Sequence, residues 1–188
     1  MTLRPARMTP GTTQLAAQVT TQPRRVVVLG LGNLIRCDDG AGIHAIQRLL
    51  GDPRLPANVE VMDGGTLGLQ LLPAIEDATH ILVLDAVNSG AAPGAIVRYA
   101  MSELEPLPGS PSVHQIGFAD MLEGLRWMNK FSNKEIVLLG VQPEQTGWGE
   151  NLSPAVEAAL PALIQATLQE LQDWQGTIET PASALHIA

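Results

Sequence analysis

Acidic residues and one histidine stand where this sequence can do chemistry. Asp38 and Asp39 follow a glycine-rich segment, and Asp85 comes directly after the apolar run 81–84. His114 follows a proline-rich segment and opens a predicted helix. Carboxylates and an imidazole bind divalent metal ions, and a set of this size leaves coordination positions open. A metal site with open positions is therefore one interpretation of these residues.

Most of these residues also have a structural interpretation. Asp38 or Asp39 could cap the helix that follows, because acidic side chains are favoured at helix N-termini. His114 could be an ordinary residue at a helix end. Asp85 is harder to explain in this way, since a carboxylate at the mouth of a buried strand is costly without a partner.

A second acidic segment follows the predicted strand 59–62. It consists of Asp63, Gly64, Gly65 and Thr66. An aspartate before two glycines is typical of a turn, so this segment has both a structural and a functional interpretation.

The sequence lacks the residues that dinucleotide binding, phosphate binding and covalent proteolysis require. Ile35 occupies the position of the third glycine in a dinucleotide-binding fingerprint, and Lys130 and Lys134 do not follow a phosphate-binding loop. No Gly-x-Ser-x-Gly elbow is present. Cys37 stands beside two acids, which disfavour the thiolate that a nucleophile needs. A covalent protease is therefore not expected.

The net charge, the cysteine count and the length of the apolar runs exclude several classes of binding partner and site. The net charge of −8 disfavours nucleic acid, whose phosphates need clustered cations. A single cysteine excludes a disulfide within the chain and a thiolate metal cage. No apolar run approaches the roughly 20 residues of a membrane span. We expect a cytoplasmic protein that binds neither nucleic acid nor membrane.

The candidate residues need a scaffold, and the pattern of the chain predicts one. Short apolar strands alternate with amphipathic helices, which predicts an α/β domain with a mostly parallel sheet. Ligands bind such sheets beyond the carboxyl ends of the strands, where the acids stand. The predicted strands are 26–29, 59–62, 81–84, 95–99 at an edge, and 136–139; the predicted helices are 39–50, 67–75, 114–128 and 154–174, the last capped by Ser153. We expect a disordered leader over 1–23, the domain over 24–174 and a disordered tail over 175–188.

Five segments in this order and spacing resemble the hydrogenase maturation protease family, over roughly residues 24–174. The first is the run VVVLGLGNLIRCDDGAG, and the others are MDGGT, LDA, SVHQIG and GVQPE. The resemblance implies a three-layer α/β/α sandwich around a five-stranded twisted sheet with one antiparallel strand. Residues 95–99 are the natural candidate for that strand.

The resemblance also implies roles for the candidate residues. Asp39, Asp85 and His114 fall on the metal ligands of the family, and residues 63–66 fall on its substrate-recognition loop. Asp38 is a candidate general base, although it is equally a candidate helix cap.

The function implied is that of an endopeptidase, which removes the C-terminal extension of the nickel-loaded large subunit of a nickel–iron hydrogenase. The partner is then the large-subunit precursor. Nickel arrives with the substrate, and other divalent ions can occupy the site. The alternatives are a nickel-binding chaperone or sensor without catalysis and another hydrolase on the same fold.

Overall fold

The computed structural model describes residues 24–100 and 113–176. The predicted leader 1–23, the proline-rich segment 102–112 and all but the first two residues of the predicted tail lie outside the described residues.

A five-stranded sheet forms the middle of the molecule, in the order β2-β1-β3-β5-β4. The strands β2, β1, β3 and β5 run parallel, and the edge strand β4 pairs antiparallel with β5. The prediction of an antiparallel edge strand at 95–99 is confirmed. The strands are β1 Val26–Leu31, β2 Val59–Gly65, β3 His80–Ala86, β4 Ile96–Ala100 and β5 Glu135–Val141.

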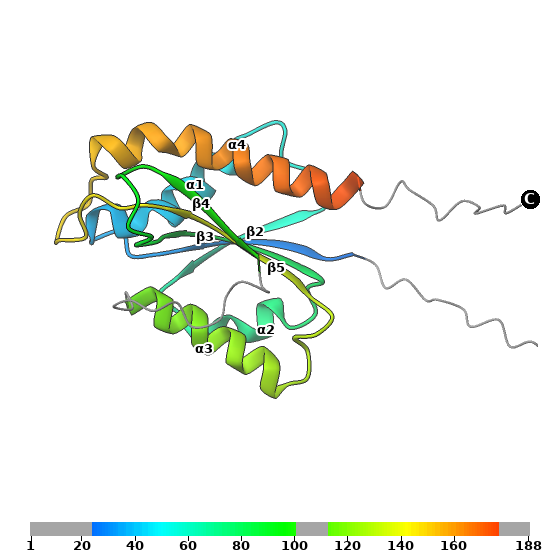
Figure 1. Ribbon diagram of the computed structural model, residues 1–188. Coiled ribbons are helices and arrows are strands. Elements are labelled where there is room, and N and C mark those ends of the chain that lie inside the picture. Colours follow the sequence, from blue (N-terminus) through cyan, green and yellow to red (C-terminus); the bar gives the residue numbers. More distant parts are fainter. Residues whose placement is uncertain (1–23, 101–112, 177–188) are drawn as a thin grey trace, which may run out of the picture.

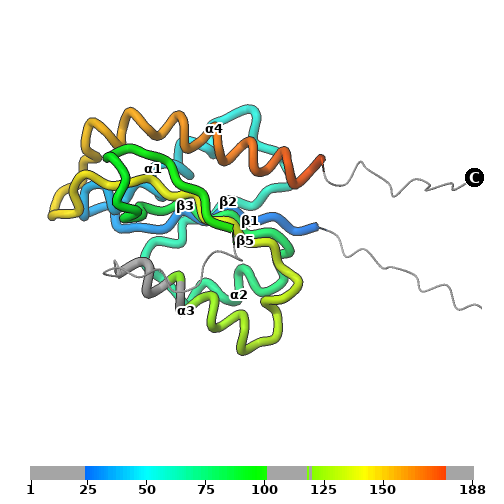
Figure 2. Tube along the Cα trace, viewed as in Figure 1, coloured from blue at the N-terminus to red at the C-terminus, as the bar shows by residue number. Residues whose placement is uncertain are grey.

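Helices cover both faces of this sheet, which confirms the predicted sandwich (Figure 1). The helices α1 Ala41–Leu49 and α4 Pro154–Gly176 lie on one face. The elements η2 Gly68–Leu71, α2 Leu72–Ile75 and α3 Val113–Trp127 lie on the other face, as the trace in Figure 2 also shows. Because both faces of the sheet are covered, the central strands β1 and β3 are buried along their whole length.

Two helix boundaries differ from the sequence prediction. The predicted helix 39–50 begins with a 3₁₀ turn, η1 Cys37–Gly40, and becomes α-helical only at Ala41. The carbonyl oxygen of Asp39 accepts a hydrogen bond from the backbone N–H of Asn33 at 3.2 Å, a contact that no local pattern reveals. The predicted helix 67–75 is split into η2 and α2.

The last helix follows its prediction closely. Ser153 Oγ accepts a hydrogen bond from the N–H of Val156 at 3.3 Å, which confirms Ser153 as the N-cap. The helix continues through Pro161 and ends at Gly176, two residues beyond the predicted end. Within the described ranges, no helix is both long enough and apolar enough to cross a membrane.

Candidate active site at the carboxyl ends of the strands

The first turn of α1 rests directly on the ends of β1 and β3. It can do so because Gly42 has no side chain: a Cβ there would lie 2.1 Å from the carbonyl oxygen of Leu84 and 2.4 Å from that of Leu31. The element η1, which precedes α1, also contacts β3. Asp39 in η1 and Asp85 in β3 are thereby brought to the same edge of the sheet.

The end of β2 joins this edge through backbone contacts. The N–H of Gly32 donates to the carbonyl oxygen of Gly65 at 3.0 Å. Gly32 has a φ of +133°, and a Cβ at this position would lie 2.0 Å from the carbonyl oxygen of Asp39. Only glycine fits here. The end of β2 therefore contacts the loop after β1, and this loop in turn packs against the backbone of Asp39.

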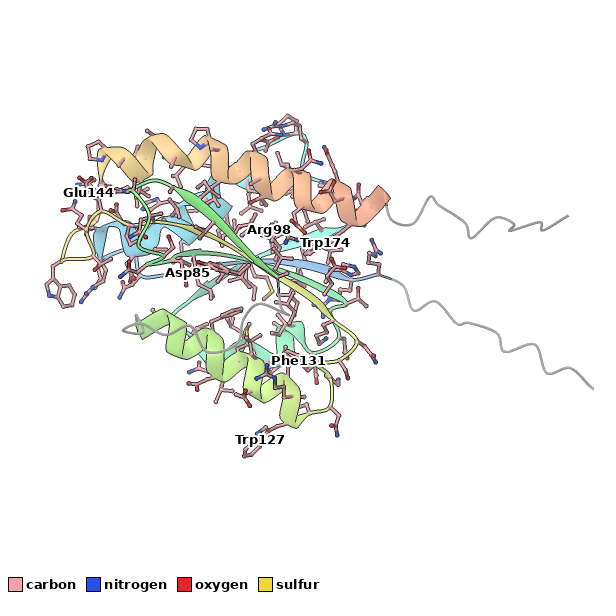
Figure 3. The ribbon with its side chains drawn as sticks, viewed as in Figure 1. Asp85, Arg98, Trp127, Phe131, Glu144 and Trp174 are labelled. Carbon is pink, nitrogen blue, oxygen red and sulfur yellow. The ribbon has the colours of Figure 1, made fainter. Side chains whose placement is uncertain are left out.

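Both carboxylates are buried at this edge. Asp39 is 5% exposed and Asp85 is 2% exposed, and each has interaction partners within the protein. Asp85 Oδ1 accepts a hydrogen bond from the backbone N–H of Ala86 at 2.7 Å. In Figure 3, Asp85 and Glu144 lie toward one end of the sheet and Trp174 toward the other. Two carboxylates in a water-poor setting can bind a metal ion strongly.

The carboxylate of Asp38 does not cap α1 but binds the loop that follows β5. Its Oδ2 accepts hydrogen bonds from the N–H groups of Glu144 at 2.9 Å and Gln145 at 3.0 Å, and its Oδ1 accepts one from Ser153 at 2.6 Å. The N-cap of α1 is Gly40 instead. The buried carboxylate of Asp38 thus holds the loop 142–153 against η1, and its role as general base stays a prediction.

The strand β2 continues through Gly65, three residues beyond its predicted end, so Asp63, Gly64 and Gly65 end the strand and the turn begins at Thr66. Asp63 Oδ1 accepts a hydrogen bond from the N–H of Gly65 at 2.9 Å, and Gly65 has a φ of +48°. The side chains of Asp63 and Thr66 are exposed, while Gly64 is buried. A small recess beside this turn is lined by Leu31, Gly65, Thr66, Gly68, Leu71, Phe118 and Met121. The predicted substrate-recognition role of the segment stays a prediction.

His114 is the second residue of α3, so the predicted helix start is confirmed. Its side chain lies outside the described part of the chain. Among the residues that the structure describes, no three His, Cys, Asp or Glu side chains are grouped as a metal site. The assignment of Asp39, Asp85 and His114 as ligands accordingly stays a prediction.

One feature at this edge was missed by the sequence predictions. The loop after β5 pairs with the segment before η1: the N–H of Gly149 donates to Ile35 O at 3.0 Å, and the N–H of Cys37 donates to Gly149 O at 2.7 Å. Trp148 stands exposed on this loop beside Arg36. A tryptophan in a glycine-containing loop was the only signal in the sequence. Cys37 itself is buried, in keeping with the inert role predicted for it.

Known proteins resemble this chain in sequence and in fold. The family model described as hydrogenase maturation protease matches residues 43–170. The hydrogenase expression/formation protein HupD of Rhodobacter capsulatus is 37% identical over 156 residues, which are 81% of this chain and 74% of that protein. The hydrogenase 2 maturation protease of Escherichia coli K12 is 34% identical over 164 residues, which are 86% of this chain and 99% of that protein.

Solved structures agree. The hydrogenase maturating endopeptidase HybD from Escherichia coli superimposes with a TM-score of 0.74 at 34% identity, over 79% of this chain and 93% of that chain. The [NiFe] hydrogenase maturation protease HybD from Thermococcus kodakarensis gives a TM-score of 0.67 at 27% identity, over 78% and 98%. These matches favour a peptidase over a non-catalytic nickel-binding module. The chain belongs to the hydrogenase maturation protease family.

Proposed function

We propose that this chain is the endopeptidase that removes the C-terminal extension of a nickel-loaded hydrogenase large subunit. The observation that carries the proposal is the pair of buried carboxylates, Asp39 and Asp85, at the ligand-binding edge of the sheet in a member of this family. The relatives' names, such as hydrogenase 2 maturation protease, indicate the substrate. The cytoplasmic location expected from the sequence stays a prediction.

The donor set suits nickel that the substrate brings. Asp39 and Asp85 supply oxygen ligands, and an imidazole is a common ligand of nickel. We assign the imidazole to His114, the second residue of α3, which falls on the histidine ligand of the family motif. A divalent ion bound there would polarise the carbonyl of the scissile bond or lower the pKa of a water.

The protein's own residues then position the substrate. The carboxylates would share the metal with the thiolates of the large subunit, and the segment 63–66 would contact the chain next to it. Cys37 is buried under the loop 142–153, so an attacking thiol is not part of this mechanism. The attacking group is therefore water. Asp38 is less suited to activate this water, because its oxygens already accept hydrogen bonds from three backbone N–H groups.

A cleavage assay on a gel tests the proposal. Purified nickel-loaded precursor should shorten, and the precursor without nickel should resist. Asp85→Asn should lower the rate about 100-fold, the change that about 3 kcal/mol of lost transition-state stabilisation produces. Cys37→Ala is the matched control and should keep its activity. Rapid cleavage of nickel-free precursor, or full activity of Asp85→Asn, would contradict the metal-dependent mechanism.

A further inference from the structure

We infer that Arg36 and Trp148 form a substrate-positioning platform beside Asp39, which binds the precursor next to the scissile bond. The inference rests on the proposed function and names a part of the protein that holds the substrate. The occupant is an extended segment of the large-subunit precursor, with an apolar side chain adjacent to a carboxylate or carbonyl oxygen.

The two side chains stack on one another at the surface. The guanidinium carbon of Arg36 lies 5.3 Å from the centroid of the Trp148 ring, a cation–π contact. Trp148 is nevertheless 77% exposed, so most of a large apolar ring faces water. Tryptophan and arginine are the residues that most often dominate binding energy at protein interfaces.

The backbone fixes this pair in place. Arg36 forms a parallel β-bridge with Gly149, which follows Trp148 directly. The hydrogen bonds of Ile35 and Cys37 to Gly149 flank the bridge on both sides. Both residues of the platform therefore lie on backbone that is already ordered by pairing. Binding then costs less conformational entropy than it would on a flexible loop.

The platform also has a fixed relation to the candidate metal ligand. The carboxylate of Asp38 anchors the Trp148-bearing loop at Glu144 and Gln145 on one side and at Ser153 on the other. Asp38 adjoins Asp39 in the same 3₁₀ turn. The N–H of Asp39 donates a hydrogen bond to the carbonyl oxygen of Arg36 at 3.1 Å, so the backbone of the platform adjoins the proposed metal ligand.

Charge and polarity define the occupant. Arg36 forms no ion pair with a carboxylate in the described part of the chain, so its guanidinium can bind an acceptor oxygen. Ile35, at 50% exposure, extends the apolar surface next to it. Glu144 and Glu150 are exposed on the same loop and would repel a strongly acidic run. These features fit one acceptor oxygen beside an apolar side chain.

Cleavage kinetics test the platform, and Trp127 provides a matched control. Trp148→Ala and Arg36→Ala should raise KM for nickel-loaded precursor about tenfold, the effect of losing one cation–π or aromatic contact, with kcat little changed. Trp127→Ala removes an indole that is 87% exposed at the end of α3 and should match the wild type. A KM for Trp148→Ala equal to that of Trp127→Ala, or a fall in kcat alone, would overturn the inference.

A binding measurement separates this inference from the proposed function. The chain has three tryptophans, so protein labelled with 5-fluorotryptophan gives three fluorine resonances that single Trp→Phe variants assign. A synthetic peptide spanning the cleavage site of the precursor should shift the Trp148 resonance and leave those of Trp127 and the buried Trp174 in place. If the wild type leaves the nickel-loaded precursor intact, the proposed function fails, yet a shift at Trp148 still supports the platform. An unchanged Trp148 resonance overturns it.

Discussion

The carboxylate of Asp38 binds both ends of the loop 142–153. Three backbone N–H groups converge on its two oxygens from residues more than a hundred positions away in the chain. Charged acceptors make stronger hydrogen bonds than neutral ones, and burial strengthens them further. Asp38 thereby couples η1 to the end of β5 and to the start of α4.

Asp38→Asn should therefore destabilise the fold by about 2–4 kcal/mol. The amide keeps one oxygen and replaces the other by an NH₂ group, which leaves at least one buried N–H without an acceptor at about 1–3 kcal/mol and weakens the remaining bonds. Urea unfolding measures the change. Asp120→Asn, an exposed acid on α3, should unfold like the wild type. Equal stability of the two variants would show that the Asp38 contacts are dispensable.

His80 gives the stability a dependence on pH. Burial lowers its pKa from 6.5, the positive charge of Arg24 lowers it further, and Glu135 opposes the shift. The unfolded chain then binds more protons than the folded protein as the pH falls below about 6.5, so the free energy of unfolding decreases from about pH 7 to about pH 5. His80→Gln should have a shallower dependence in urea unfolding over this range.

His44 is the matched variant for this measurement. Burial, followed by Arg48, lowers the pKa of His44 as well, so His44→Gln should remove a separate part of the slope. The pKa of Asp52 is lowered to about 2 by hydrogen bonds from Arg54, which keeps its titration below the range measured. A slope unchanged in His80→Gln would mean that its proton uptake is the same in the folded and unfolded states.

At the scale of elements, the contact of α1 with the sheet decides the position of Asp39. Gly42→Ala should destabilise the protein by about 3 kcal/mol or more, because the new Cβ meets backbone oxygens that cannot turn away. The helix would have to lift from β3 and carry η1 with it, so cleavage should fall together with stability. Thermal unfolding and the gel assay report the two effects.

Gly51→Ala provides the comparison. A Cβ at this position would lie 3.6 Å from the carbonyl oxygen of Arg48, an ordinary contact, and its φ is not positive. This variant should keep both the stability and the activity of the wild type. If Gly42→Ala behaved in the same way, the close approach of α1 would not be what positions Asp39.

The elements differ in how far the sequence predicts them. The inner strands were predictable because both of their faces are covered, and each accordingly contains a run of apolar residues, such as 26–29 and 81–84. The start of the helix after β1 was not, because the carbonyl oxygen of Asp39 binds Asn33 in the preceding loop. Asp38 shows the same limit within the site: its carboxylate binds a loop distant in sequence, and helix-capping preferences contain no information about such contacts.

At the scale of the whole molecule, the proposed ligands join distant parts of the chain. Asp39 precedes α1 on one face of the sheet, Asp85 is the penultimate residue of the central strand β3, and His114 is the second residue of α3 on the other face. The layers can be followed in Figure 1. A metal ion bound by all three would link the sheet to both helical layers.

A bound metal ion should accordingly stabilise the entire domain. A ligand that binds only the folded protein adds about 2.7 kcal/mol at one hundred times its dissociation constant, which for a domain of this size raises the Tm by roughly 5–10 °C. Differential scanning calorimetry with Ni²⁺ alone, without precursor, should show this shift in the wild type. Asp85→Asn should lose most of it, since an amide is a poorer ligand than a carboxylate. Asp63→Asn, which alters an exposed carboxylate near the end of β2, should retain it. An equal shift in Asp85→Asn would place the ion elsewhere on the protein, and no shift in the wild type would contradict a nickel site formed by these three residues alone.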